Sequence, residues 1–214
     1  MTLTWLIFEI LGTIAFAFSG AVVGLSRRMD IFGISVLAVM TGVGGGMIRD
    51  VLCGITPPSA LQNPGGLLVS IATALLVSFL YPLWKLTENN RRLIVFAYNI
   101  SDTIGLAAFT VTGALTAFYK FPDSYHYLLP TMLGMITAVG GGMLRDMMAR
   151  RMPVVLYMDV YAVASAAGGL VLCILRQQSI PLSYASWTAF GIVVLLRFLA
   201  IHFKWQLYHP HRKR

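Results

Sequence analysis

Two short segments of the chain combine a run of glycines with a pair of charged residues. Residues 44–50 read GGGMIRD, and residues 140–146, 96 positions later, read GGGMLRD. Each glycine destabilises a helix by about 1 kcal/mol relative to alanine, so three in succession predict a break. The N–H groups freed by a break can hold a carboxylate, and the freed carbonyl groups can hold an ammonium or a metal cation. The predicted solute ligands are Gly44, Gly45, Gly46, Gly140, Gly141 and Gly142.

The alternative is that these glycines only allow two helices to approach closely. Pairs of small residues four positions apart, such as Gly42 with Gly46, have this role in membrane proteins. Three adjacent glycines, however, point in three directions around a helix, which a packing contact does not require. We therefore favour the break, with both segments lining one site near the middle of the membrane.

Two acidic residues occupy matching positions ahead of the glycine segments. Glu9 and Asp102 each stand three residues before a glycine, Gly12 and Gly105 respectively. A carboxylate inside a membrane can hold a substrate ammonium, bind a cation or carry a proton. Asn99 lies one helical turn before Asp102 and faces the same side. We expect these three polar side chains to bind the solute. The alternative for Asp102 is a structural contact with an arginine or with a hydroxyl of a neighbouring helix.

The charged pairs that follow the glycines are Arg49 with Asp50 and Arg145 with Asp146. Charges within a membrane are costly and usually functional, although these lie close enough to an interface for the side chains to reach it. Two roles stay open for them. One is contact with the substrate or a gate, and the other is an ion pair that fastens the helix to its neighbours.

The composition places all of these residues in a membrane protein. The 214 residues are 57% hydrophobic and only 11% charged, and the mean hydropathy is +0.76. So few polar residues cannot cover a water-soluble globule. The apolar residues come in long runs joined by short polar pieces, which leaves no room for a separate soluble domain. We expect residues 1–214 to form a single membrane domain.

Seven apolar stretches approach the roughly 20 residues that a helix needs to cross a bilayer. Membrane β-barrels need shorter segments of alternating character, so these stretches predict an all-α protein. The predicted spans are Leu3–Leu25, Ile31–Cys53, Leu67–Trp84, Leu93–Tyr119, Tyr125–Met148, Val154–Leu175 and Tyr184–Phe203.

The basic residues predict how these spans are oriented. The net charge of +8 comes from Lys and Arg residues clustered between spans, which indicates membrane topology and no nucleic-acid partner. Twelve of the sixteen fall on one side and three on the other, with Arg197 inside the last span. Since cytoplasmic loops are rich in basic residues, we expect the N-terminus outside and the C-terminus in the cytoplasm. A basic tail, residues 208–214, would interact there with the lipid bilayer.

The glycine segments belong to a longer internal repeat. Phe16 and Gly20 in the first span match Phe109 and Gly113 in the fourth, at an offset of 93. Each half contains three spans, residues 3–84 and 93–175, and an odd number turns the second half upside down relative to the first. A seventh helix, residues 184–207, follows. Inverted repeats of this kind are common in secondary transporters.

Motifs of other function classes are missing from the sequence. It contains no nucleotide-binding P-loop, zinc signature or nucleophile elbow. We therefore expect no enzyme activity, no catalytic residue, no metal site and no cofactor.

The paired GGGMIRD and GGGMLRD segments, in spans two and five of seven, resemble the bacterial UPF0126 family of inner-membrane proteins, whose repeat carries the name glycine transporter domain. More distantly, the chain is similar to the TRIC trimeric intracellular cation channels, which share the plan of three plus three plus one helices. Those channels carry a lysine-containing motif after the glycines, where this chain has an Arg-Asp pair. The resemblance implies a multi-pass protein of the bacterial inner membrane. The likeness to the channels implies a homotrimer, and a dimer is equally compatible with the exposed small residues.

The leading functional hypothesis is a secondary transporter for a small zwitterion such as glycine, with the substrate implied by the resemblance. The glycine breaks would bind its carboxylate, while Asp102 and Glu9 hold its ammonium group. The alternative is a TRIC-like channel for K⁺, in which backbone carbonyls coordinate the ion. A third class is a scaffold or sensor that transports nothing.

Overall fold

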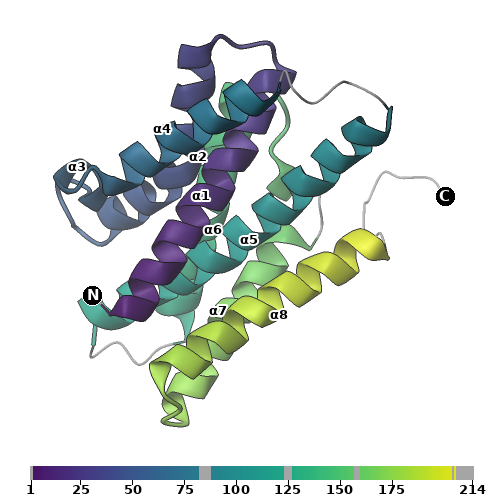
Figure 1. Cartoon of the computed structure of the whole chain (residues 1–214). Helices are drawn as coiled ribbons and strands as arrows, with labels where there is room; N and C mark the ends of the chain where they lie inside the picture. The colour runs from purple at the N-terminus through teal and green to yellow at the C-terminus, as the bar shows by residue number, and fades with distance from the viewer. Residues whose placement is uncertain (1, 82–87, 123–126, 157–159, 204, 206–214) are drawn as a thin grey trace.

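The computed structural model describes residues 2–81, 88–122, 127–156, 160–203 and 205, and every regular element in them is helical (Figure 1). The all-α prediction is thus confirmed, whereas the predicted basic tail, 208–214, lies outside the described residues. The helices are α1 (Leu3–Ser26), α2 (Ile31–Leu52), α3 (Ser59–Gln62), α4 (Gly65–Leu80), α5 (Glu88–Lys120), α6 (Leu128–Met148), η2 (Val154–Leu156, a 3-10 helix), α7 (Tyr161–Gln177) and α8 (Leu182–His202).

Five of these helices are long and apolar enough to cross a membrane, namely α1, α2, α5, α6 and α8. The apolar helices α4 and α7 are shorter, with 16 and 17 residues. Each predicted span overlaps one of these seven helices, but the number that crosses the bilayer stays a prediction. The short α3 was not expected from the sequence, and the sixth span was expected to start at Val154, seven residues before α7 begins.

The glycine runs do not break their helices, which corrects the sequence-based prediction. Both α2 and α6 are continuous through them. The reason is that the two helices cross in backbone contact: a Cβ atom on Gly45 would lie 2.2 Å from the Thr137 carbonyl oxygen, and one on Gly141 would lie 2.3 Å from that of Thr41. Close packing of two helices therefore describes Gly45 and Gly141, whereas a Cβ atom on Gly46 or Gly142 would meet only side-chain atoms, at 3.3 Å or more. Their backbone groups stay within the helices and are not freed to bind a solute.

The contacts among α1, α2 and α4 recur among α5, α6 and α7. Helix α4 packs on α1 and α2, and α7 packs correspondingly on α5 and α6. Helices α1 and α5 run antiparallel: a Cβ atom on Gly12 would meet the Phe109 ring, and one on Gly105 would meet the Phe16 ring. The buried rings of Phe16 and Phe109 stand edge to face, with centroids 5.3 Å apart. Helix α8 then covers α5 and α7 (Figure 1).

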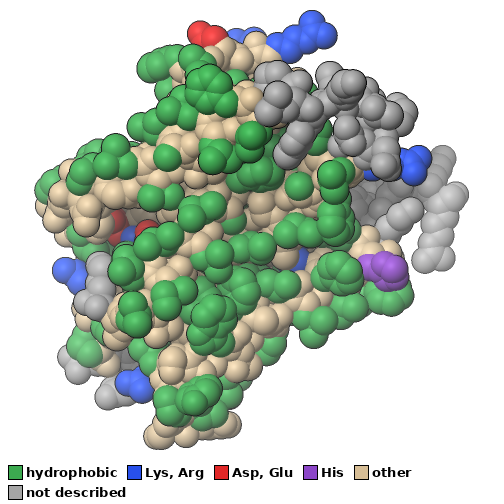
Figure 2. Space-filling model, viewed as in Figure 1, with side chains coloured by type: hydrophobic (Ala, Val, Ile, Leu, Met, Phe, Trp, Pro, Cys, Tyr) green, Lys and Arg blue, Asp and Glu red, His purple; other side chains and the backbone are tan. Residues whose placement is uncertain are grey.

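Large apolar side chains cover much of the outer surface (Figure 2). On α4, for example, Leu68, Leu76 and Phe79 are each at least 60% exposed, and Leu195 and Phe198 are exposed on α8. Water-soluble proteins rarely expose apolar patches of this extent. The surface is therefore suited to contact with lipid chains.

Candidate solute-binding site

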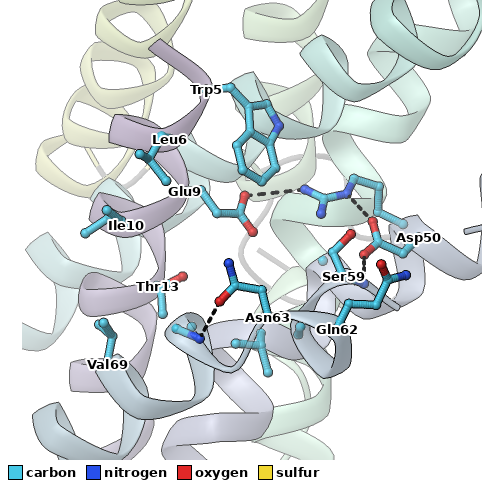
Figure 3. Close-up of a pocket in the computed structure, with 16 residues that line it drawn as sticks. Trp5, Leu6, Glu9, Ile10, Thr13, Asp50, Ser59, Gln62, Asn63 and Val69 are labelled. Atoms are coloured by element: carbon cyan, nitrogen blue, oxygen red, sulfur yellow. Dashed lines mark hydrogen bonds and ion pairs between the residues drawn. The ribbon is translucent and has the colours of Figure 1, made fainter. Parts of the chain in front are cut away.

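A cavity of about 420 Å³ opens between α1, α2 and the segment that contains α3 and the start of α4 (Figure 3). In the space-filling view, acidic and basic atoms are visible in a recess on this side of the molecule (Figure 2). The polar and glycine residues of the lining that matter most are Glu9, Arg49, Asp50, Asn63, Gly65 and Gly66.

The charged group of this cavity consists of Glu9, Arg49 and Asp50. Arg49 donates from Nη1 to Glu9 Oε2 at 3.4 Å and from Nε to Asp50 Oδ1 at 2.9 Å. Its guanidinium carbon also lies 5.6 Å from the centroid of the Trp5 ring. Arg49 and Asp50 are buried, whereas 25% of the Glu9 side chain is exposed. Two carboxyl groups and one guanidinium group give this group a formal net charge of minus one, and Glu9 is its member that is exposed to the cavity.

Asp50 and the end of α2 hold the return loop in place. The Ser59 N–H donates to Asp50 Oδ2 at 2.8 Å, while Asp50 Oδ1 accepts from Arg49. The loop leaves α2 through Gly54, whose φ of +69° lies in the left-handed region that favours glycine. Both oxygens of Asp50 are thus engaged within the protein. Asp50 positions the lining, and Glu9 is the carboxylate left to contact a solute.

The first turn of α4 supplies the opposite chemistry to the same cavity. The cap residue Pro64 makes no side-chain hydrogen bond to the helix, and Gly65 donates its N–H to Asn63 Oδ1 at 3.1 Å. The N–H of Gly66 has no partner within the helix because it belongs to the first turn. Helix N-termini carry partial positive charge and suit anions. An acidic side chain and a helix end that suits an anion therefore line one cavity.

A second charged cluster repeats the first in the other half of the chain. Arg145 donates from Nη1 to Asp102 Oδ1 at 2.5 Å and from Nε to Asp146 Oδ1 at 2.8 Å. Its guanidinium carbon lies 5.2 Å from the centroid of the Tyr98 ring, and Asp146 Oδ2 accepts the Val154 N–H at 2.9 Å. Each contact has its counterpart around Arg49. The ion-pair alternative for Asp102 is thus observed.

The second cluster differs from the first in charge and in access. Arg145 also donates to the Ser19 hydroxyl at 2.6 Å, and Arg151 donates to Asp146. The formal negative charges of the two carboxyl groups, Asp102 and Asp146, equal the positive charges of the two arginines in this cluster. Arg145, Asp102 and Asp146 are all at most 2% exposed. No net charge is therefore left for a solute in this conformation.

The two clusters lie on opposite sides of the glycine crossing. Glu9 belongs to one and Ser19 contacts the other, and ten residues of α1 separate them, or about 15 Å. The predicted binding residues therefore do not share one cavity in this structure. Glu9 and Gly46 line the cavity, whereas Asp102 belongs to the second cluster and Asn99 lies half-buried on α5 outside the cavity lining.

Comparison with known proteins places the chain in a family. The family model described as Glycine transporter matches it twice, over residues 6–82 and 99–177. The membrane protein YvgT of Bacillus subtilis (strain 168) is 34% identical over 98% of this chain and 97% of its own length. The inner membrane protein YadS of Escherichia coli (strain K12) is 36% identical over 98% and 96%. Both relatives carry the family name UPF0126.

The chain belongs to the UPF0126 family of membrane proteins. The suspected resemblance is thereby confirmed, and the family together with the apolar helices makes this a multi-pass protein of a bacterial membrane.

Solved structures of TRIC channels have the same fold as this UPF0126 protein. A prokaryotic TRIC channel in 0.5 M KCl is 30% identical with a TM-score of 0.86, covering 97% of this chain and all of that one. The orthologue from Rhodobacter sphaeroides, named a trimeric intracellular cation channel, is 27% identical with a TM-score of 0.85, covering 95% and 100%. The family model that matches this UPF0126 protein is thus named for a transporter, and the solved structures that share its fold are named cation channels.

Several residues of the UPF0126 site were not singled out from the sequence. Trp5 and Tyr98 each lie against an arginine of the repeat, and they are 93 positions apart, the offset already found for this part of the repeat. Extending the repeat toward the N-terminus would have found this pair. Asn63 and Gly66 had no such signal, because a polar loop residue and a glycine are ordinary at the start of a helix.

Proposed function

We propose that this UPF0126 protein is a secondary transporter for a small zwitterion such as glycine, which binds in the cavity beside Glu9. The observation that carries the proposal is the pairing of opposite chemistries in that cavity: the partly exposed carboxylate of Glu9 and the first turn of α4, where the Gly66 N–H has no partner within the helix. A zwitterion presents a positive and a negative group at short separation, which this pairing would satisfy together. The name of the matching family model supports the choice of glycine.

In the proposed complex, the solute's ammonium group donates to Glu9. Arg49 contacts Oε2 of that carboxylate at 3.4 Å, which is long for a charged hydrogen bond, so the carboxylate keeps capacity to accept. The solute's carboxylate accepts the N–H of Gly66 at the start of α4. Asn63 lies near both of these protein groups, and Figure 3 shows its side chain between Glu9 and α4. The glycines of α2 and α6 are no longer part of the binding proposal.

The proposed membrane arrangement follows the sequence repeat. Seven spans form two inverted halves, residues 3–84 and 93–175, followed by a seventh helix, 184–207, with the N-terminus outside and the C-terminus in the cytoplasm. The antiparallel pairing of α1 with α5 and the reciprocal contacts of Gly45 and Gly141 support this inversion. Solute access from alternating sides is then the natural mechanism, as in other inverted-repeat transporters.

The direct test is uptake of labelled glycine into proteoliposomes that contain the purified protein. We expect accumulation that depends on an imposed proton or sodium gradient and is competed by unlabelled glycine. Protein-free liposomes provide the baseline. Failure to exceed that baseline under any imposed gradient would contradict transport of glycine.

A second candidate function is a channel for monovalent cations. The specific observation in its favour is the match to TRIC channel structures over at least 95% of this chain. The net negative charge at Glu9 suits a cation as well as an ammonium group. Planar-bilayer recording in KCl separates the two functions, because a channel gives unitary currents and a transporter does not. The same likeness supports a homotrimer, which native mass spectrometry would detect.

A further inference from the structure

The second half of the chain has a residue that fills the place of the first half's cavity. Ser59 and Val154 make the same N–H contact to the aspartate of their half, and they are 95 positions apart. The buried serines 70 and 165 keep this offset. At the same offset, Gly66 in the cavity lining corresponds to Tyr161. The cavity beside Glu9 thus exists where the other half has a tyrosine ring.

Tyr161 lies directly beside the second charged cluster. It is 1% exposed, and the guanidinium carbon of Arg197 lies 4.7 Å from its ring centroid. Its Oη atom is 3.3 Å from the position that a Cβ atom on Gly142 would occupy, and Arg145 Nη2 is 3.7 Å from the same position. In the first half, Arg49 Nη2 and Glu9 Oε1 lie at 3.4 and 3.6 Å from the Cβ position on Gly46. Tyr161 therefore stands against the same arginine nitrogen that faces the open cavity in the first half.

Two buried polar atoms at this place lack a hydrogen-bond partner within the described part of the chain. They are Arg145 Nη2 and Tyr161 Oη. Buried polar atoms are rarely left unsatisfied in folded proteins, and those that are call for an explanation such as a bound molecule or a second state. Both atoms can donate a hydrogen bond, so an oxygen atom is the partner that they fit.

We propose that the second half holds a latent solute-binding site beside Asp102 and Arg145, which Tyr161 fills in the present conformation. When the Tyr161 ring moves out, the site takes a small zwitterion, whose carboxylate oxygen accepts from Arg145 Nη2. The identity of the solute rests on the proposed function; the existence of the site does not. The cavity at Glu9 and the latent site at Asp102 then open on opposite sides of the glycine crossing.

The test measures access to Gly142 with a membrane-impermeant thiol reagent. The background is the full-length protein with both native cysteines, Cys53 and Cys173, replaced by alanine. Gly142→Cys is introduced alone and together with Tyr161→Leu, and Gly46→Cys reports on the open cavity. Gly191→Cys, on the exposed face of α8 with open space at its Cβ position, is the control for a residue facing lipid.

We expect Gly46→Cys to be modified from one side of the membrane and Gly142→Cys to be protected. Adding Tyr161→Leu should speed modification of Gly142→Cys at least tenfold, and from the opposite side. Protection that persists, or modification from the same side as Gly46→Cys, would overturn the latent site. If the leucine variant does not elute as a folded protein on size exclusion, Tyr161→Met replaces it, and the same two results decide. Labelling reads access without transport, so its outcome is independent of whether glycine uptake is observed.

Discussion

Glu9 and Asp102 are equivalent in the repeat, but they have different surroundings and therefore different roles. Asp102 accepts a 2.5 Å hydrogen bond from Arg145 and is buried. Glu9 meets Arg49 at 3.4 Å and keeps a quarter of its side chain exposed to the cavity. A carboxylate buried against an arginine stabilises the fold, whereas one that is exposed to a cavity can exchange its partner for a solute.

Replacing Glu9 by glutamine should reduce solute transport more than stability. Glu9→Gln keeps the shape of the side chain but removes the charge that would hold an ammonium group. A hydrogen bond to a charged group contributes about 1.5–3 kcal/mol, so glycine uptake should fall tenfold or more at subsaturating substrate. The measurement is initial uptake into proteoliposomes at equal protein content. Asp30→Asn is the matched control, because Asp30 caps α2 far from the cavity and asparagine caps equally well. Unchanged uptake in Glu9→Gln would remove Glu9 from the site.

Replacing Asp102 by asparagine should instead lower stability. Asp102→Asn leaves Arg145 with less compensation for its buried charge, and breaking a buried pair in this way costs about 3–5 kcal/mol. The melting temperature in detergent, followed by size exclusion after heating, should fall well below those of the wild type and Glu9→Gln. A variant with wild-type melting temperature would show that the Asp102 pair contributes little to the fold.

At the level of the elements, the prediction from the sequence was wrong at the crossing of α2 and α6, where we expected two helix breaks and the structure has two continuous helices. A helix break and a close crossing both require glycine, so the residue types alone cannot separate them. The deciding fact is which backbone faces each glycine, and that depends on how two distant segments pack. The spans themselves were predicted within a few residues for most helices, because runs of apolar residues depend on local composition. The cavity could not be predicted, since it results from a difference between the halves, Gly66 against Tyr161.

Adding a methyl group at the crossing should separate the two helices. Gly45→Ala places a Cβ atom 2.2 Å from the Thr137 carbonyl oxygen, which neither backbone can accommodate without moving. Overpacking of this kind costs about 1–3 kcal/mol. The melting temperature in detergent should therefore fall.

Gly191→Ala is the control for the Gly45 substitution. Gly191 lies within α8 and has nothing within 4 Å of its Cβ position, so alanine there should raise stability by about 0.5–1 kcal/mol. Equal effects of the two substitutions would mean that the crossing is not a tight contact in the membrane.

At the scale of the whole molecule, the apolar surface indicates a membrane protein, and the uneven distribution of basic residues predicts how it is oriented in the membrane. The exposed apolar side chains of α4 and α8 suit contact with lipid, and twelve of the sixteen Lys and Arg residues belong to one predicted side. Charge distribution predicts orientation better than it predicts function, because insertion machinery responds to loop charge irrespective of the site that the helices enclose.

A reporter fused to the C-terminus should therefore lie in the cytoplasm. Green fluorescent protein placed after Arg214 should fluoresce, and alkaline phosphatase at the same position should be inactive. Fusion of each reporter in the loop between α1 and α2 should give the same result, because both positions belong to the basic-rich side. Active phosphatase at the C-terminus would reverse the proposed orientation.

The contact between Gly45 and Gly141 also limits how the two halves can move. Arg49 and Arg145 each lie four residues beyond their glycine, on helices that cross in opposite directions. A rigid tilt of α2 against α6 about this point would widen the space at one arginine while narrowing it at the other. The crossing therefore acts as a pivot. The spaces at the two arginines cannot both open at the same time unless the contact between Gly45 and Gly141 is lost.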